Sequence, residues 1–190
     1  MLTIRRAAVA LGIAVAAAGL VACDADQVGA AAVVGDERIT VSDLQDDVLA
    51  FHEFAGTEPV GDQTDLQRGY LQAEIRHLIV TQVGEDIGVT VSEAAVDQYI
   101  ADQFLAQNPE GELSQLMVDN MLTEQGFRDA IHDTIMIDAL VAEVGDENAV
   151  GEMFDATAES LEIEINPRYG AWEGVGLDPV SGSISVPAGS

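Results

Sequence analysis

Apolar side chains recur at helical spacing over most of the chain, and this spacing restricts the possible fold more than any other feature of the sequence. The clearest stripe consists of Leu71, Ile75, Leu78, Ile79 and Val83. Such a period is typical of an amphipathic helix that buries one side. The same pattern predicts helices over residues 42–55, 63–84, 90–104, 113–122, 123–144 and 150–160. We therefore expect a mainly α domain of about five to six helices.

Short polar motifs mark where three of these helices begin. Ser42 with Gln45 has the spacing of a capping box, and Thr90 with Glu93 has the same spacing. Thr123 is placed to cap the fifth helix through its hydroxyl. These caps support the helix starts that the apolar spacing indicates.

Strand patterns occur only on either side of the helical block. Residues 31–34 and 38–40 flank a Gly-Asp-Glu turn, which predicts a hairpin, and residues 161–165 alternate apolar and acidic side chains. We expect the first and last of these segments to pair and to close the helical domain. Leu161, Ile163 and Ile165 would then lie on the core face. The alternative is that each segment is extended but isolated.

The first 22 residues have the composition of a leader that is removed. Arg5 and Arg6 precede an uncharged apolar run over residues 7–22, which is short for a helix that spans a membrane. The run ends in a sequence that resembles a bacterial lipobox: Leu20, Val21, Ala22 and Cys23. The resemblance implies that the Cys23 thiol receives a lipid, that the chain is cut before it, and that the new N-terminus is acylated, for example by palmitate. The alternative is a buried structural cysteine behind an ordinary signal peptide.

Lipid attachment would place the protein on the extracytoplasmic face of the cell membrane, because two acyl chains suffice for stable anchoring. Residues 23–30 would form a lipidated tether and residues 31–172 the helical domain. Residues 173–190 are rich in Gly, Ser and Pro, which predicts a flexible tail. With a single cysteine, no disulfide can form within the chain.

The chain is strongly acidic, with 34 Asp and Glu residues against 7 Lys and Arg residues and a formal net charge of −27. Lysine is absent, and two of the arginines lie in the leader. Phosphate groups repel such a body, which argues against nucleic acid as a partner. Anionic lipid head groups repel it as well, so the domain is expected to stand off the bilayer surface.

Sequence motifs that indicate a catalytic or metal site are scarce in this chain. Neither a Gly-x-Ser-x-Gly turn nor a Gly-rich phosphate loop occurs in the sequence. Two pairs, Glu74 with His77 and Asp129 with His132, have the i, i+3 spacing of di-iron bundles. Such a centre also needs an inward acid on each of two other helices, and chance matches are easy in so acidic a chain. We therefore expect no catalytic residue, no metal and no cofactor, and a protein that is not an enzyme.

Four segments, in their order along the chain, resemble the chaperone domain of SurA-like and PrsA-like foldases. They are AVVGDERITVSDL at residues 32–44, VTVSE at 89–93, TEQGFR at 123–128 and NPRYGAW at 166–172. The resemblance implies a helical domain whose N- and C-terminal segments join and which holds unfolded or nascent exported polypeptides. Many members carry a parvulin prolyl isomerase module after the long helix, but only residues 145–148 separate the helices here. We therefore expect no isomerase activity. The NPRYGAW motif is interpreted as a lock between the C-terminal strand and the helices, with an aromatic contact for bound chain as the alternative.

A holding chaperone needs an apolar surface that can adapt to varied partners, and methionine-rich surfaces have this property. The candidate client-binding residues are Phe104, Leu116, Met117, Met121, Phe127 and Trp172. Burial in the core is the alternative for them. The sequence thus predicts a lipid-anchored holding chaperone that acts without ATP. The competing hypothesis is a non-enzymatic lipoprotein that serves as a fixed binding or assembly module for one envelope partner.

Overall fold

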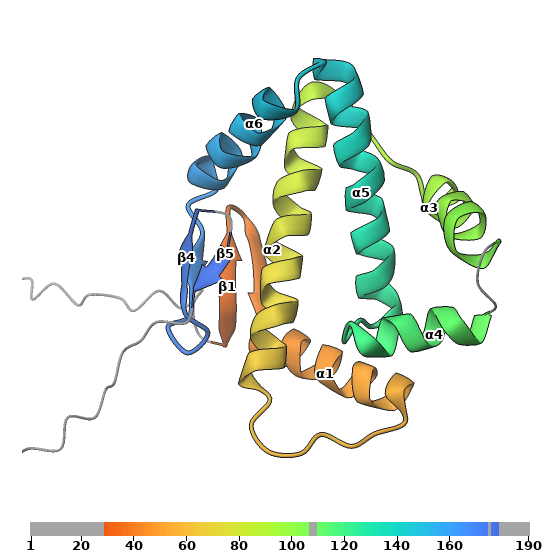
Figure 1. The fold of residues 1–190 in the computed structure, drawn as a ribbon. Helices are drawn as coiled ribbons and strands as arrows, with labels where there is room; N and C mark the ends of the chain where they lie inside the picture. Colours follow the sequence, from red (N-terminus) through yellow and green to blue (C-terminus); the bar gives the residue numbers. More distant parts are fainter. Residues whose placement is uncertain (1–28, 107–109, 175, 179–190) are drawn as a thin grey trace, which may run out of the picture.

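The computed structural model describes residues 29–106, 110–174 and 176–178, and within these ranges the fold is mainly α, as predicted (Figure 1). The proposed leader, the lipobox residues Leu20, Val21 and Ala22, and Cys23 lie outside the described residues. The described α-helices are α1 (Val41–Ala55), α2 (Thr64–Ile87), α3 (Glu93–Ile100), α4 (Glu110–Asp119), α5 (Glu124–Val144) and α6 (Glu147–Ser160). No helix among the described residues is both long enough and apolar enough to cross a membrane.

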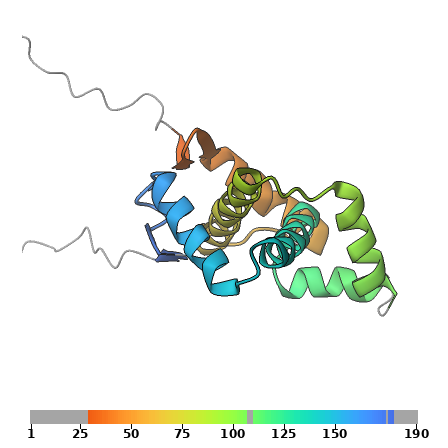
Figure 2. The same cartoon turned by 90° about the horizontal axis from the view of Figure 1, so that it is seen from above.

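The two longest helices, α2 and α5, lie side by side at the centre of the fold (Figures 1 and 2). The predicted stripe on α2 faces inward, because Leu71, Ile75, Ile79 and Val83 are all buried. Helix α6 packs beside α2 and α5, whereas α3 packs on the other side of α5. Three apolar clusters result: one between the sheet, α1 and α2, one between α2, α5 and α6, and one between α3, α4 and α5.

A glycine allows α2 and α5 to approach closely near one end of the pair. Gly84 is buried on α2, and a Cβ atom at this position would lie 2.7 Å from Met136 Sδ and 3.0 Å from the Val89 carbonyl oxygen. Cβ atoms essentially never come that close to another heavy atom. The absence of a side chain at residue 84 therefore leaves room for the Met136 side chain of α5 and for the Val89 carbonyl group.

The helix starts agree with the sequence in one case and differ in two. Thr123 caps α5 as predicted, since its Oγ1 accepts from the Gly126 backbone N–H at 2.9 Å. The capping box predicted for α1 at Ser42 and Gln45 is wrong by two residues. Thr40 and Asp43 form the box instead, because the preceding strand runs directly into the helix and leaves Thr40 extended.

Ser92, rather than Thr90, is the N-cap of α3, and its hydroxyl accepts from the Ala95 N–H at 3.3 Å. The helix then continues as a π-helical turn, η2 (Ala101–Leu105). Helix α4 begins and ends three residues earlier than predicted. Its end is set by Met121, which has a left-handed φ of 53° and breaks the helical path before Thr123.

The predicted closure of the domain is confirmed by a three-stranded antiparallel sheet in the order β2-β1-β3. Strand β1 (Ala30–Val34) pairs with β2 (Glu37–Thr40) through a hairpin and with the short β3 (Glu164–Ile165) on its other side. The register places Ala32 opposite Ile165. Leu161, Ile163 and Ile165 are partly buried against the core, as expected for the inner face of the closing segment.

A second hairpin was not predicted. Strand β4 (Ala171–Glu173) pairs with β5 (Gly176–Asp178), with Trp172 opposite Leu177. The sequence placed residues 173–178 in a flexible tail, and the structure corrects this boundary because Leu177 is buried in the core. Residues 179–190 lie outside the described residues.

Tyr169 holds the NPRYGAW motif against α2. Its ring is fully buried, its hydroxyl donates to Gln67 Oε1 at 3.3 Å, and its carbonyl oxygen accepts from Arg68 Nε at 2.7 Å. The motif therefore locks the C-terminal strands onto the helices, in line with its interpretation from the sequence.

Candidate functional site

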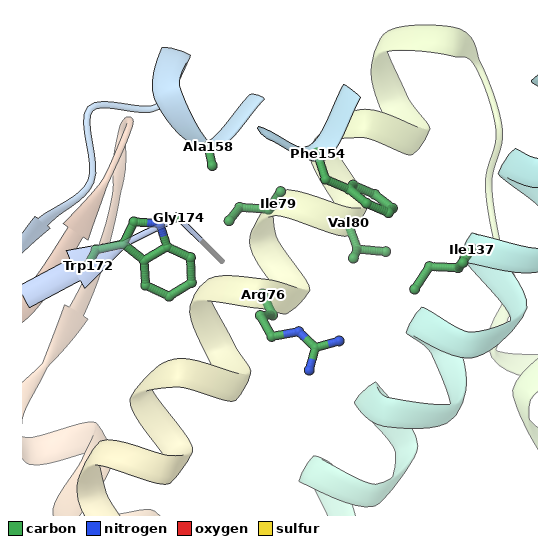
Figure 3. Close-up of a pocket in the computed structure, with 8 residues that line it drawn as sticks. All are labelled: Arg76, Ile79, Val80, Ile137, Phe154, Ala158, Trp172 and Gly174. Atoms are coloured by element: carbon green, nitrogen blue, oxygen red, sulfur yellow. The ribbon is translucent and has the colours of Figure 1, made fainter. Parts of the chain in front are cut away.

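An apolar cavity of about 240 Å³ opens where α6 and the second hairpin meet the central helix pair (Figure 3). Helix α2 contributes Ile79 and Val80 to its wall, and Phe154 and Trp172 lie on other elements around it. The complete lining consists of Arg76, Ile79, Val80, Ile137, Phe154, Ala158, Trp172 and Gly174. Pockets for drug-sized ligands usually have about 300–1,000 Å³, so this cavity is suited to individual apolar side chains.

The side chain of Trp172 is unusual at this cavity. Its ring lines the cavity from β4, while its indole Nε1 is buried and has no hydrogen-bond acceptor among the described residues. A buried donor without a partner costs about 1–3 kcal/mol. The indole N–H is therefore a donor that could bond to an acceptor entering the cavity.

The sequence did not identify most of this cavity. Of the predicted client-binding residues, only Trp172 lines it. The sequence did contain one indication of a second apolar surface on α2. Ile79 and Val80 are adjacent, so their side chains point in different directions and cannot both pack against the same neighbour. Phe154 on α6 gave a second signal, because a large aromatic side chain on a short amphipathic helix needs a surface to cover.

The other predicted client-binding residues gather around the α3–α4–α5 cluster and divide into two groups. Met117 and Phe127 are 5 % exposed and belong to that cluster, and Phe104 packs against them with its ring 5.2 Å from that of Phe127. Leu116 and Met121 are 42 % and 56 % exposed. Buried and exposed members therefore do not form one continuous surface, and client binding at these residues stays a prediction.

A second, acidic cavity of about 380 Å³ lies along the same helix pair, nearer α1. Asp47, Glu74, Asp129 and Asp133 line it together with His77. Burial raises the pKa of Glu74, and the neighbouring Asp47 and Asp129 raise it further. Burial is also the largest cause that raises the pKa of Asp47, followed by Asp43 and Asp46. The fold thus places several carboxyl groups together in a partly buried cavity, where the ionised forms of Glu74 and Asp47 cost free energy.

The structure brings together the two histidines that the i, i+3 motifs singled out. His77 Nδ1 on α2 lies 2.7 Å from Asp133 Oδ1 on α5, and His132 Nδ1 lies 3.4 Å from the same oxygen. The two rings meet edge to face with centroids 5.1 Å apart. The hydrogen bond to Asp133 is the largest cause that raises the pKa of His77. His52 is remote from this group and bonds to Thr57 and Gln63 instead.

Comparison with known proteins gives one match. No curated protein and no solved structure matches the chain significantly. The family model for the SurA-like N-terminal domain matches residues 2–160, which is most of the chain. The helical core closed by β1 and β3 agrees with the fold that this resemblance implied from the sequence. The chain therefore belongs to the family of SurA-like N-terminal domains.

Proposed function

We propose that this protein is a lipid-anchored holding chaperone that binds unfolded exported polypeptides outside the cytoplasm without using ATP. The observation that carries the proposal is membership of the SurA-like N-terminal domain family, which points to a chaperone-like role. The lipobox-like sequence that ends at Cys23 supports an anchor on the extracytoplasmic face of the cell membrane. Release of the protein from membranes by Cys23→Ala would test that anchor, and unchanged attachment would contradict it.

The cavity beside Trp172 is the proposed client site, and its occupant is an extended apolar segment of an unfolded chain. Ile79, Val80 and Phe154 offer apolar contacts that do not depend on the client's sequence. The cavity holds side chains one at a time, which suits weak and reversible binding of many chains. Arg76 at the cavity can interact with client carbonyl groups or acidic side chains.

The charge of the protein supports the same role. An acidic surface keeps a domain with an open apolar cavity soluble and attracts the basic segments of clients. Like-charge repulsion between chaperone copies that carry clients also limits their joint aggregation.

The proposed activity does not include prolyl isomerisation. Helix α5 ends at Val144, and α6 begins at Glu147, so the connection at which many family members insert a parvulin module is two residues long here. We identify no set of residues in this connection that could form such a catalytic site.

Light scattering of an aggregating unfolded protein tests the proposal. The chain from residue 23 onward is added at stoichiometric amounts, at low and at high salt, beside an equally acidic inert protein. Suppression of aggregation at both salt concentrations, by the chain and not by the acidic control, would support holding through an apolar surface. Suppression only at low salt, shared with the control, would contradict it.

A pair of variants on α6 locates the site. Ala158 lines the cavity, whereas Ala156 is exposed on the same helix. Ala158→Leu should fill the cavity and weaken the suppression of aggregation, and Ala156→Leu should leave it unchanged. Equal activity of both variants would exclude this cavity as the client site. A single tight envelope partner, with no effect on unfolded chains, would instead favour a fixed assembly module.

A further inference from the structure

We infer that the central helix pair carries a binding site for a divalent transition-metal ion, with Zn²⁺ the best match, whose ligands are His77, His132 and Asp133. This inference concerns the acidic cavity and does not depend on the proposed chaperone function. The three side chains come from α2 and α5, and one potential ligand atom of each lies within 4.8 Å of the others.

Two of the three distances between ligand atoms are within about 0.6 Å of the value that a metal ion requires, and the third, between the two histidines, is within 4.8 Å. With bonds of about 2.0–2.1 Å, two ligand atoms of a tetrahedral zinc site lie about 3.3 Å apart. His132 Nδ1 and Asp133 Oδ1 are 3.4 Å apart, whereas His77 Nδ1 and the same oxygen are 2.7 Å apart in their hydrogen bond. Binding at these atoms therefore needs His77 to withdraw from Asp133 by roughly half an ångström, which a side-chain rotation provides.

The type of donor selects the type of ion. Imidazole nitrogen suits Zn²⁺, Ni²⁺ and Co²⁺, while Mg²⁺ and Ca²⁺ prefer oxygen ligands alone. Two imidazoles and one carboxylate are a donor set that zinc uses in proteins, with room for a water or a fourth side chain. Glu74 and Asp129 line the same cavity but are not part of the group of close ligand atoms, so we assign the fourth position to a water.

The surroundings of the three ligands favour a cation. Glu74, Asp129 and Asp47 lie along the same cavity. Burial and the acidic neighbours raise the pKa of Glu74 and that of Asp47, so negative charge on these two carboxyl groups is opposed. Arg76 also lines the cavity, but a single guanidinium cannot balance four carboxylates. The side chains of His77, His132 and Asp133 are partly buried, at 29 %, 17 % and 15 % exposure, so an ion can reach them from solvent.

A bound ion would join α2 to α5 at the centre of the fold. Because such an ion binds the folded chain more tightly than the unfolded chain, it should stabilise the domain by an amount that grows with the logarithm of its concentration above the dissociation constant. The expected effect is a higher melting temperature in the presence of Zn²⁺ and a return to the original value after chelation.

Calorimetric titration with ZnCl₂ tests the inference. The chain from residue 23 onward, which contains every described residue, is used with Cys23→Ser so that no thiol can compete. An excess of Mg²⁺ blocks binding by surface carboxylates alone. We expect one Zn²⁺ per chain, a dissociation constant that rises about tenfold or more in His77→Gln and in His132→Gln, and no change in His52→Gln. His52→Gln is a matched control because His52 is the remaining one of the 3 histidines.

Two outcomes would overturn the inference. One is weak binding of several ions that Mg²⁺ abolishes, which would show an unspecific effect of the acidic surface. The other is binding that His77→Gln and His132→Gln leave intact. Ring-nitrogen NMR on the chain without histidine substitutions makes the test independent of whether those variants fold. Zn²⁺ should shift the signals of two histidines and leave the third in place, and a spectrum unchanged by Zn²⁺ would contradict the site.

Discussion

The two cavities along the α2–α5 pair have opposite chemistry although they share Arg76 and Ile137 in their walls. The cavity near α6 is apolar and includes Trp172, whereas the cavity near α1 is lined by four acidic side chains. On α2 the change takes only a few residues, from Glu74 and His77 to Ile79 and Val80. The comparison teaches that one helix pair can border two cavities of opposite chemistry when different neighbours pack against it.

The neighbours account for the difference. Near α6, the apolar cavity is bordered by Phe154 and by Trp172 of the second hairpin, so this part of the pair meets mainly apolar side chains. Near α1, the side chain that α1 contributes is Asp47, so that part of the pair meets a polar side chain. A chaperone client and a metal ion would thus use different parts of one scaffold, and changes in one part should leave the other intact.

The largest expected effect comes from loosening the helix pair itself. Leu140 is fully buried on α5, in the cluster between α2, α5 and α6. Leu140→Ala should lower the free energy of unfolding by about 2–5 kcal/mol, because the substitution loses buried apolar contacts and leaves a void. Urea denaturation measures this change. A loss below 1 kcal/mol would show that the pair does not depend on this contact.

A smaller loss is expected at Gly84, where α2 contacts the Met136 side chain of α5. Gly84→Ala places a Cβ atom 2.7 Å from Met136 Sδ and 3.0 Å from the Val89 carbonyl oxygen. Overpacking of this kind costs about 1–3 kcal/mol, and the better helix propensity of alanine returns up to about 1 kcal/mol. Gly69→Ala is the matched control, since a Cβ atom on Gly69 of the same helix would meet nothing within 4 Å. Urea denaturation should show the control to be as stable as the original chain or more stable.

The sequence predicted the scaffold much better than either site. The stripe on α2 and the alternation in residues 161–165 indicate which side of each element is buried. This information is contained in neighbouring residues of the sequence, so it can be read without knowing the fold. The meeting of His77 with His132 depends on how α2 and α5 are aligned, which no local pattern contains. The i, i+3 motifs did mark the two histidines that meet, but the sequence alone did not indicate that they meet across two helices beside Asp133. The second hairpin was missed because only Leu177 and Trp172 supply its apolar contacts.

A substitution at Trp172 can separate the role of its apolar ring from the role of its buried N–H group. Trp172→Phe keeps an aromatic wall and removes the donor that has no acceptor among the described residues. Removal of the unpaired donor should stabilise the folded chain by about 1–3 kcal/mol, and the smaller ring should lose apolar contacts of similar worth. The free energy of unfolding should therefore change by less than about 1 kcal/mol. Suppression of aggregation should decrease if the N–H binds client carbonyls. Unchanged suppression would assign client binding to the ring alone.

The smallest effect tests the acidic cavity. Asp47 stands four residues after Asp43 on α1, and like charges at this spacing destabilise a helix by about 0.2–0.5 kcal/mol. Asp47→Asn should therefore raise the free energy of unfolding at neutral pH and low salt by a few tenths of a kcal/mol. Glu152→Gln, an equal change of charge on an exposed position of α6, is the control and should have no comparable effect.

The pH dependence of this gain has a definite sign. Folding raises the pKa of Asp47 through burial and through its acidic neighbours, so the folded chain binds the proton more tightly than the unfolded chain. The ionised carboxyl costs stability at neutral pH, and this cost disappears as the pH falls through the raised pKa. The difference in urea midpoint between Asp47→Asn and the original chain should therefore shrink on acidification and in high salt. A difference that grows in acid would show that the Asp47 carboxylate is stabilised in the folded chain, and the acidic cavity would then hold less repulsion than its geometry indicates.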